Sequence, residues 1–505
     1  MIDNFIILPV LVHMFTAIIA IFFWQKVNIQ RVISILGSSI GLVLSLKLFL
    51  KTQGTGILTM QAGDWQAPFG ITFVSDTFSS VLVLLTGIVA ISVSLFSTAA
   101  VSTNRIRYGY FAIFHFLIMG LNGAFLTGDI FNLYVWFEIV IISSFVLMTL
   151  GGRKPQMEGA IKYVAMNMLA SIIFLTAIGI LYGITGSLNM ADLAVKVAQI
   201  ENRGLVNVTG LLFFVGFGIK SAVFPLYFWL PSSYHTPPSS IAALFGGLLT
   251  KVGIYAMFRI FTLIFVPDHF MMNLFIIVAI MTLVTGALGA ISKNSMRRMF
   301  SYLIVCHIGY FIAGLGLFTE IAIAGAIFYL IHDIIVKTNL FLVSGIIYKA
   351  RGSTDLRRLG GFYKDYPKLS ILFAIVLFSL AGIPPLSGFW PKINLFQATL
   401  TANSFILILA LIFASFITLY LIAKIWLEVF WKGLPKGDIE KGDEFEDLPG
   451  EKKFVLILPV VSLAAVSIFI GFGAEYVMKI SQKIAVEMID TQPYIHAVLG
   501  DLLSK

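Results

Sequence analysis

The chain has 505 residues, of which 59% are hydrophobic and only 12% are charged. A soluble globular domain is about 45–50% apolar and about 25% charged, so a soluble fold has no place for this much apolar surface. The formal net charge of +9 lies mostly in connections between apolar runs, which is not the distribution of a nucleic-acid-binding surface. The composition therefore predicts a polytopic membrane protein.

Apolar runs along the chain predict an all-α fold. A transmembrane helix needs about 20 predominantly apolar residues, and the chain holds about fourteen such runs. The first run is longer than the apolar core of a cleavable signal peptide and follows Asp3 rather than a basic leader, so we expect it to be retained. The runs cover residues 4–24, 30–50, 72–98, 107–127, 130–150, 159–183, 204–229, 239–264, 270–291, 296–317, 321–349, 370–397, 402–431 and 454–475.

Basic residues concentrate in every second connection between these runs. The connections of opposite parity carry Lys47, Lys51, Lys196 and Arg203. Because positively charged loops stay in the cytoplasm, this pattern predicts a multi-pass protein of the bacterial inner membrane with both termini outside. The basic connections lie at residues 26–31, 105–107, 153–154, 293–298, 349–368 and 432–453.

The seventh and twelfth runs are interrupted by proline close to a lysine. The seventh has a lysine and a proline within 220–225, and the twelfth has three prolines and a lysine within 384–392. Proline removes a backbone donor and clashes with the preceding turn, so both helices should break there. The freed carbonyls need partners inside protein or in a wet cavity, and paired broken helices are a mark of ion pathways in transporters.

The two interrupted runs are five helices apart, which predicts two five-helix repeats of inverted orientation, helices 4–8 and 9–13. We expect a single membrane domain over residues 1–505. Its predicted parts are N-terminal helices in 1–98, a first repeat in 107–264, a second repeat in 270–431, a cytoplasmic loop in 432–453 and a last helix in 454–475.

Ionisable residues lie deep inside several runs. A charge at the bilayer centre costs about 2.5–3.5 kcal/mol on insertion scales, so each such group needs a partner, water or both. For any one of them a purely structural role is an open alternative, but the whole set indicates a connected polar interior. The residues are Glu138, Lys220, Lys251, His307, His332, Asp333, Lys337, Lys392 and Lys424.

The residue types suit proton transfer. Burial lowers the pKa of a lysine and a nearby carboxylate raises it again, so a Glu–Lys pair that tightens and loosens would act as a proton valve. Glu138 and Lys220 are the candidates for such a pair, Lys251 and Lys392 are candidate carriers, and His307 and His332 are either core residues or relays.

For the remaining lysines, a structural role is an alternative to proton transfer. Asp333 and Lys337 stand at i,i+4 with the acid first, which suits a local ion pair, and an inert, mutually neutralising pair is one alternative to a role of Lys337 in proton transfer. Lys424 lies near a helix end and is expected to extend toward the membrane surface. No histidine pair has the spacing of zinc ligands, and the single cysteine, Cys306, cannot build a disulfide or a haem attachment, so we expect no metal and no cofactor.

Three stretches give the chain a family resemblance. They are residues 220–231 continuing to Lys251, residues 355–361 and residues 381–389. With them the chain resembles, over nearly its whole length, the antiporter-like subunits found in respiratory complex I and in Mrp-type multisubunit cation/proton antiporters. The resemblance implies fourteen core helices, two inverted repeats and a central polar axis.

Along that axis the resemblance implies a Glu138–Lys220 pair, Lys251 as the central relay, His332 and Lys337 as its continuation, and Lys392 as its end. It also implies a sodium/proton antiporter whose partners are other subunits, protons, Na⁺ and the bilayer. Lys392, where complex I members of this length usually have glutamate, and the short C-terminal tail favour the Mrp type. A complex I proton-pumping subunit is the alternative.

A transporter for an organic solute, working alone, is the alternative from a different class. It would need a midplane pocket with ligand-specific polar groups. In this chain the buried polar residues are mostly titratable and distributed over several helices, which favours a proton path.

Overall fold

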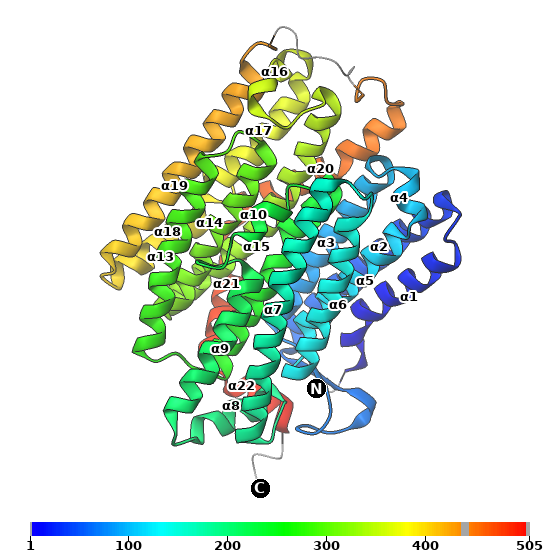
Figure 1. Cartoon of the computed structure of the whole chain (residues 1–505). Coiled ribbons are helices and arrows are strands. Elements are labelled where there is room, and N and C mark those ends of the chain that lie inside the picture. The colour runs from blue at the N-terminus through cyan, green and yellow to red at the C-terminus, as the bar shows by residue number, and fades with distance from the viewer. Residues whose placement is uncertain (1–2, 436–443, 501–505) are drawn as a thin grey trace.

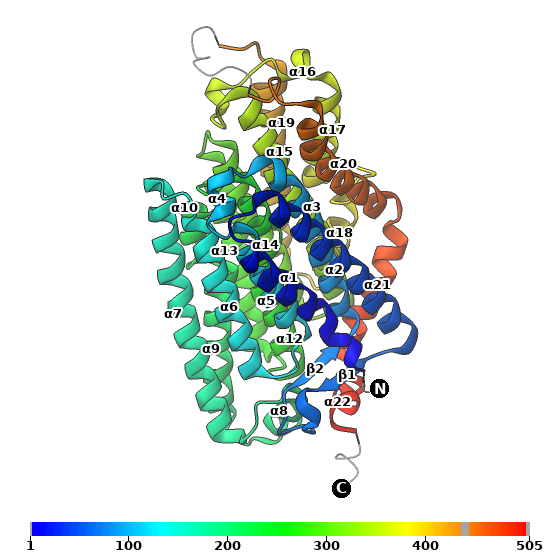
Figure 2. The same ribbon diagram turned by 90° about the vertical axis from the view of Figure 1, so that its right-hand side faces the viewer.

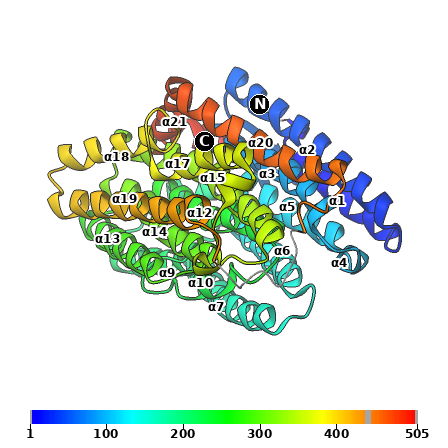
Figure 3. The same ribbon diagram turned by 90° about the horizontal axis from the view of Figure 1, so that it is seen from above.

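A computed structural model describes residues 3–435 and 444–500 as a bundle of helices that pack side by side (Figures 1 and 3). The first half contains α1 (Leu8–Phe22), α2 (Val27–Thr55), α3 (Thr77–Ala100), α4 (Thr103–Arg107), α5 (Tyr110–Leu126), α6 (Ile130–Thr149), α7 (Lys154–Thr185), α8 (Met190–Gln199), α9 (Arg203–Ser221), α10 (Trp229–Ser233), α11 (Ser239–Leu244) and α12 (Thr250–Leu263). The second half contains α13 (His269–Ile291), α14 (Met296–Leu317), α15 (Glu320–Arg351), α16 (Phe362–Asp365), α17 (Pro367–Ala381), α18 (Phe389–Thr401), α19 (Phe405–Ile425), α20 (Gly450–Phe472), α21 (Ala474–Ile489) and α22 (Gln492–Leu499).

The predicted apolar runs coincide with these helices. Twelve helical stretches of the described residues are long and apolar enough to cross a membrane, and the shorter apolar helices α5 and α17 occupy the fourth and twelfth predicted runs. The all-α membrane fold is therefore confirmed. Short 3₁₀ turns lie at η1 (Asn4–Ile7), η2 (Ala62–Asp64) and η4 (Leu356–Arg358), and π-helical turns at η3 (Phe245–Leu249) and η5 (Trp426–Trp431).

Two helical stretches form the centre of the bundle. In the most apolar 18-residue segment of each helix, 100% of the residues are buried in the α11–η3–α12 stretch and 94% in α15. The corresponding values are only 33% in α2 and 39% in the stretch that contains α19. The outer helices can therefore present apolar side chains to lipid. A charged side chain on α12 or α15 is enclosed by protein and has to find its partner there.

One predicted helix begins too early. Residues 72–75 belong to the helical run 72–98, but they form strand β2 (Thr72–Ser75), which pairs antiparallel with β1 (Leu58–Gln61) (Figure 2). Helix α3 starts only after Asp76, whose carboxylate accepts a hydrogen bond from the Ser79 amide at 2.8 Å. This capping contact, which hydropathy does not register, sets the start of the helix.

The C-terminal segment contains more helix than predicted. The last predicted span, 454–475, corresponds to α20, and α21 and α22 follow it. Helix α21 carries charges four residues apart, such as Glu475 and Lys479, so a search for apolar runs misses it. Glu487 ties α21 to α3, because it accepts hydrogen bonds from the Thr77 hydroxyl at 2.7 Å and the Thr77 amide at 3.2 Å.

The first and last described elements and two basic connections lie at opposite ends of the bundle. The β1–β2 hairpin and α22 are at one end, whereas α4 and α16 are at the other (Figures 1 and 2). The predicted loop 432–453 is described at 432–435 and 444–453, and its residues 436–443 lie outside the described residues. Residues 1–2 and 501–505, which include both predicted outer termini, also lie outside them.

Candidate functional site

Both predicted helix breaks are present, and each places a lysine in the interior. Helix α9 ends at Ser221 and the chain becomes helical again only at α10, while α17 ends at Ala381 and α18 begins at Phe389. Lys220 is the second-last residue of α9 and is 8% exposed. Lys392, in the first turn of α18, is 5% exposed and donates from Nζ to the Ala381 carbonyl at 3.0 Å, so it satisfies the carboxyl end of the half-helix before the break.

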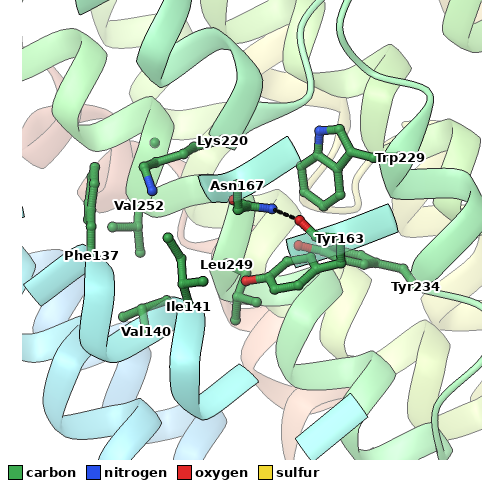
Figure 4. A pocket seen from close by; sticks show the side chains of 11 residues that line it. Phe137, Val140, Ile141, Tyr163, Asn167, Lys220, Trp229, Tyr234, Leu249 and Val252 are labelled. Carbon is green, nitrogen blue, oxygen red and sulfur yellow. Dashed lines mark hydrogen bonds between the residues drawn. The ribbon is translucent and has the colours of Figure 1, made fainter. Parts of the chain in front are cut away.

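A small cavity adjoins Lys220. It has a volume of about 20 Å³ and is lined by, among others, Phe137, Asn167 and Tyr234 (Figure 4). The Lys220 ammonium points into it, 3.3 Å from the Ser171 hydroxyl and 4.8 Å from the centre of the Phe137 ring. The Tyr234 hydroxyl has no hydrogen-bond partner among the described residues, so the cavity combines an unsatisfied hydroxyl with room for about one water molecule.

Glu138 does not contact Lys220 in this conformation. No ion pair within 4.0 Å joins the two side chains in the described part of the chain, and the buried Oε1 of Glu138 has no hydrogen-bond partner there. Successive residues of an α-helix are about 100° apart around its axis. Since Phe137 faces Lys220, the next residue is turned aside, and the predicted pair is open.

The polar centre lies around Lys251. This residue is fully buried and directly follows the first residue of α12, after the π-helical turn η3. Its ammonium donates to the Gly246 carbonyl at 2.7 Å and forms an ion pair with Asp333 Oδ2 at 2.8 Å. A π turn displaces backbone carbonyls from the regular helical pattern, which gives Lys251 its acceptor.

Asp333 does not form the local pair with Lys337 that the i,i+4 spacing suggested. Its two carboxylate oxygens contact Lys251 at 2.8 Å and His307 Nδ1 at 2.9 Å. Lys337, fully buried, has no hydrogen-bond partner for its ammonium among the described residues. The local pair that the spacing permitted is not formed, because a lysine from another helix takes the carboxylate instead. His307, which approaches the same acid from α14, belongs to this cluster.

Hydrogen bonds through two serine hydroxyls connect His332 to α20. Its Nδ1 is 2.7 Å from the Ser387 hydroxyl, which is 2.9 Å from the Ser467 hydroxyl on α20. On its other side lies Tyr329, whose ring centre is 5.6 Å from that of His332 and 5.4 Å from that of His307. Tyr329 thus stands between the two histidines, and nothing in the sequence distinguished it from a packing tyrosine.

Other buried ionisable groups escaped the sequence analysis although they lie inside predicted runs. In the N-terminal helices, His13 and His115 approach Nδ1 to Nδ1 at 2.9 Å, and neither side chain is exposed. Arg259 on α12 pairs with Asp76 at 2.5 Å. The signal for all four was available, because each interrupts an apolar run.

Comparisons with known proteins identify the family of the chain. Residues 127–418 match the family model described as "NADH:quinone oxidoreductase/Mrp antiporter, TM". The chain is 43% identical over 500 residues to the D-type subunit of the Na(+)/H(+) antiporter of Alkalihalophilus pseudofirmus, covering 99% of this chain and 100% of the relative. It is 39% identical over 502 residues to the D-type subunit of the Na(+)/H(+) antiporter of Bacillus subtilis, covering 99% and 100%.

Solved structures show the same fold. A chain of the Mrp complex from Dietzia sp. DQ12-45-1b matches with a TM-score of 0.89 and 29% identity, covering 98% of this chain and 99% of that chain. A chain of respiratory complex I from Thermus thermophilus matches in fold with a TM-score of 0.79 and 22% identity, covering 96% and 99%. The chain belongs to the NADH:quinone oxidoreductase/Mrp antiporter transmembrane family.

Proposed function

We propose that the chain is the D-type member of a multisubunit Na⁺/H⁺ antiporter, a transporter component rather than an enzyme. It carries protons along its buried axis in exchange for cytoplasmic sodium, together with the other subunits of an Mrp-type complex. The observation that carries the proposal is the fully buried Lys251–Asp333–His307 cluster between two broken helices, each of which delivers a further lysine. The two relatives named as D-type members of Na(+)/H(+) antiporters favour the Mrp type over complex I.

The geometry suggests how a proton is held and released. An ammonium in a dry interior is stabilised only by what lies against it, which for Lys251 is the Asp333 carboxylate and the Gly246 carbonyl. Lys220 has a hydroxyl and an aromatic ring but no carboxylate within 4.0 Å among the described residues. A rotation that brings Glu138 to Lys220 would favour the protonated lysine, and its withdrawal would favour release.

In this proposal protons pass from the Glu138–Lys220 pair to Lys251 and then through Lys337, His307 and His332 toward Lys392. The two broken helices occupy matching positions of inverted repeats, helices 4–8 and 9–13 of fourteen. The predicted domain parts, 107–264 and 270–431, would be these repeats. Because sodium needs a hydrated or oxygen-lined route of its own, the partner subunits would complete the exchange.

A test of the function uses everted vesicles that contain this chain with its partner subunits. We expect sodium-dependent dissipation of an imposed proton gradient, measured with a pH-sensitive dye. The exchange should proceed without NADH and resist inhibitors of quinone sites, whereas vesicles that contain this chain alone should show none. Activity that appears only during NADH oxidation would assign the chain to the complex I alternative instead.

The orientation is part of the proposal, with both termini outside and α4 and α16 in the cytoplasm. Single cysteines at Asn104 and Lys364, both exposed, are introduced into a Cys306→Ser variant. Because loops rich in lysine and arginine stay inside, an impermeant maleimide added to intact cells should leave both unlabelled.

Gln66, exposed at the hairpin end of the bundle, provides the matched control. A cysteine at this position should react with the maleimide from outside. The reverse labelling pattern would contradict the proposed orientation.

A further inference from the structure

We propose that Asp333 is the positioning carboxylate of the second half of the chain, a counter-charge shared in turn between Lys251 and Lys337. The inference rests on the proposed function and adds to it a residue for which the sequence suggested only a local pairing. Asp333 stays ionised throughout and transfers no proton itself. It stabilises whichever of the two lysines carries the proton.

The first argument comes from the proposed inverted repeats. With an offset of five helices, α6 corresponds to α14, and the broken pair α9–α10 corresponds to α17–α18. Lys220 and Lys392 then occupy comparable places at the two breaks. Where α6 carries the acid Glu138, the ionisable residue in the middle of α14 is His307, and a neutral or protonated histidine cannot supply the negative charge of a carboxylate.

The negative charge that α14 does not supply comes from Asp333 on the neighbouring helix, α15. Asp333 on α15 extends toward α14, where His307 Nδ1 contacts its Oδ1 at 2.9 Å. A histidine beside a carboxylate donates through the nitrogen that faces it, so His307 fixes the direction of the Asp333 side chain. The acid and the histidine together take the place that Glu138 occupies alone in the first half.

The second argument is the charge count of the centre. Two lysines, Lys251 and Lys337, face one carboxylate in a region where all three side chains are fully buried. Asp333 contacts Lys251 at 2.8 Å, and the Lys337 ammonium has no hydrogen-bond partner among the described residues. A buried ammonium without a counter-charge is unfavourable, so the two lysines compete for Asp333.

The third argument is that the exchange of partners needs no helix movement. Asp333 and Lys337 are one turn apart on α15, and side chains at i and i+4 have Cβ atoms about 5–6 Å apart. A rotation of the Asp333 side chain therefore brings its carboxylate from Lys251 to Lys337. The conformation described here is the one in which Lys251 holds it.

The test measures sodium-dependent proton exchange by the whole complex, normalised to the amount of assembled complex. Asp333→Asn keeps the shape and removes the charge, and we expect the exchange rate to fall about tenfold or more, since an opposite charge at contact distance changes the proton occupancy of its partner by one to three orders of magnitude. Asp333→Glu restores the charge and should recover part of the rate. Glu475→Gln removes the acid of an exposed pair with Lys479 and serves as the control, which should exchange normally.

A second variant covers the case in which Asp333→Asn complexes do not assemble. Lys337→Gln leaves the contacts of Asp333 with Lys251 and His307 intact but removes the second partner, so assembly should be normal and exchange should fall by a similar factor. Normal exchange by Lys337→Gln or by Asp333→Asn would overturn the inference, as would an Asp333→Glu complex no more active than Asp333→Asn. Each of these outcomes leaves the proposed sodium–proton exchange standing, because that function fails only if the unmodified complex does not exchange. Normal exchange by Lys337→Gln would in addition remove Lys337 from the proposed proton path.

Discussion

Replacing Lys220 or Lys251 by alanine is expected to abolish sodium–proton exchange while the complex still assembles. Each lysine is buried, and its side-chain nitrogen is the group that would hold the proton at that point of the proposed path. Alanine removes that group, and general acid–base groups contribute about 10²–10⁴-fold to the reactions they serve. The measurement is sodium-dependent dissipation of a proton gradient in everted vesicles, with copurification of the partner subunits as the measure of assembly.

Two further variants show whether the loss of exchange is specific to the buried lysines. Lys392→Ala should reduce exchange to a similar degree, because it removes the buried ammonium that caps α17 across the second break. Lys424→Ala is the matched control, since this lysine is only partly buried near the end of α19. We expect a small effect from it. Normal exchange by both the Lys220 and Lys251 variants would remove the basis of the proton path.

Asp76→Ala is expected to destabilise the protein by about 3–5 kcal/mol, the usual effect of removing one partner of a buried ion pair. Arg259 and Asp76 are 6% and 3% exposed and lie 2.5 Å apart, so the substitution leaves an arginine in the interior without its counter-charge. It also removes the cap of α3. The measurement is the midpoint of thermal unfolding of the purified complex, together with the amount of the chain in the membrane.

The exposed pair Glu475–Lys479 on α21 supplies the control. Its side chains are 78% and 66% exposed, and exposed pairs contribute about 0–1 kcal/mol, so Glu475→Ala should barely change the unfolding midpoint. Equal unfolding midpoints for the Asp76 and Glu475 variants would show that the Arg259–Asp76 contact does not stabilise the fold. This prediction concerns stability and is independent of the proposed transport function.

Several features of the site were accessible from the sequence because their causes are local. Apolar runs give the spans, since length and composition alone decide whether a helix can cross a bilayer. Proline close to lysine predicted both breaks, since the proline ring prevents the regular helix at that residue whatever surrounds it. The same local reasoning found Lys220, Lys251 and Lys392, because any ionisable residue within an apolar run has to be accommodated in the interior.

The partners of these residues could not be predicted in the same way. The spacing of Asp333 and Lys337 permits a pair on one helix, yet the ammonium of Lys251 arrives from α12 at 2.8 Å and takes the acid. Likewise, whether Glu138 or Phe137 faces Lys220 depends on the rotation of α6 about its own axis. That rotation is set by packing against α5 and α7, which hydropathy does not encode.

By itself, the sequence determined that this protein is a membrane bundle with two broken helices and titratable side chains in its interior. Hydropathy and proline chemistry act within a few residues, so they can be read along the chain. Only the tertiary structure decided which acid serves which lysine, because an ion pair between helices requires side chains distant in sequence to meet within a few ångströms. In a dry interior that meeting decides which ammonium is stabilised, and here it joins Asp333 to Lys251 and His307 in one buried cluster.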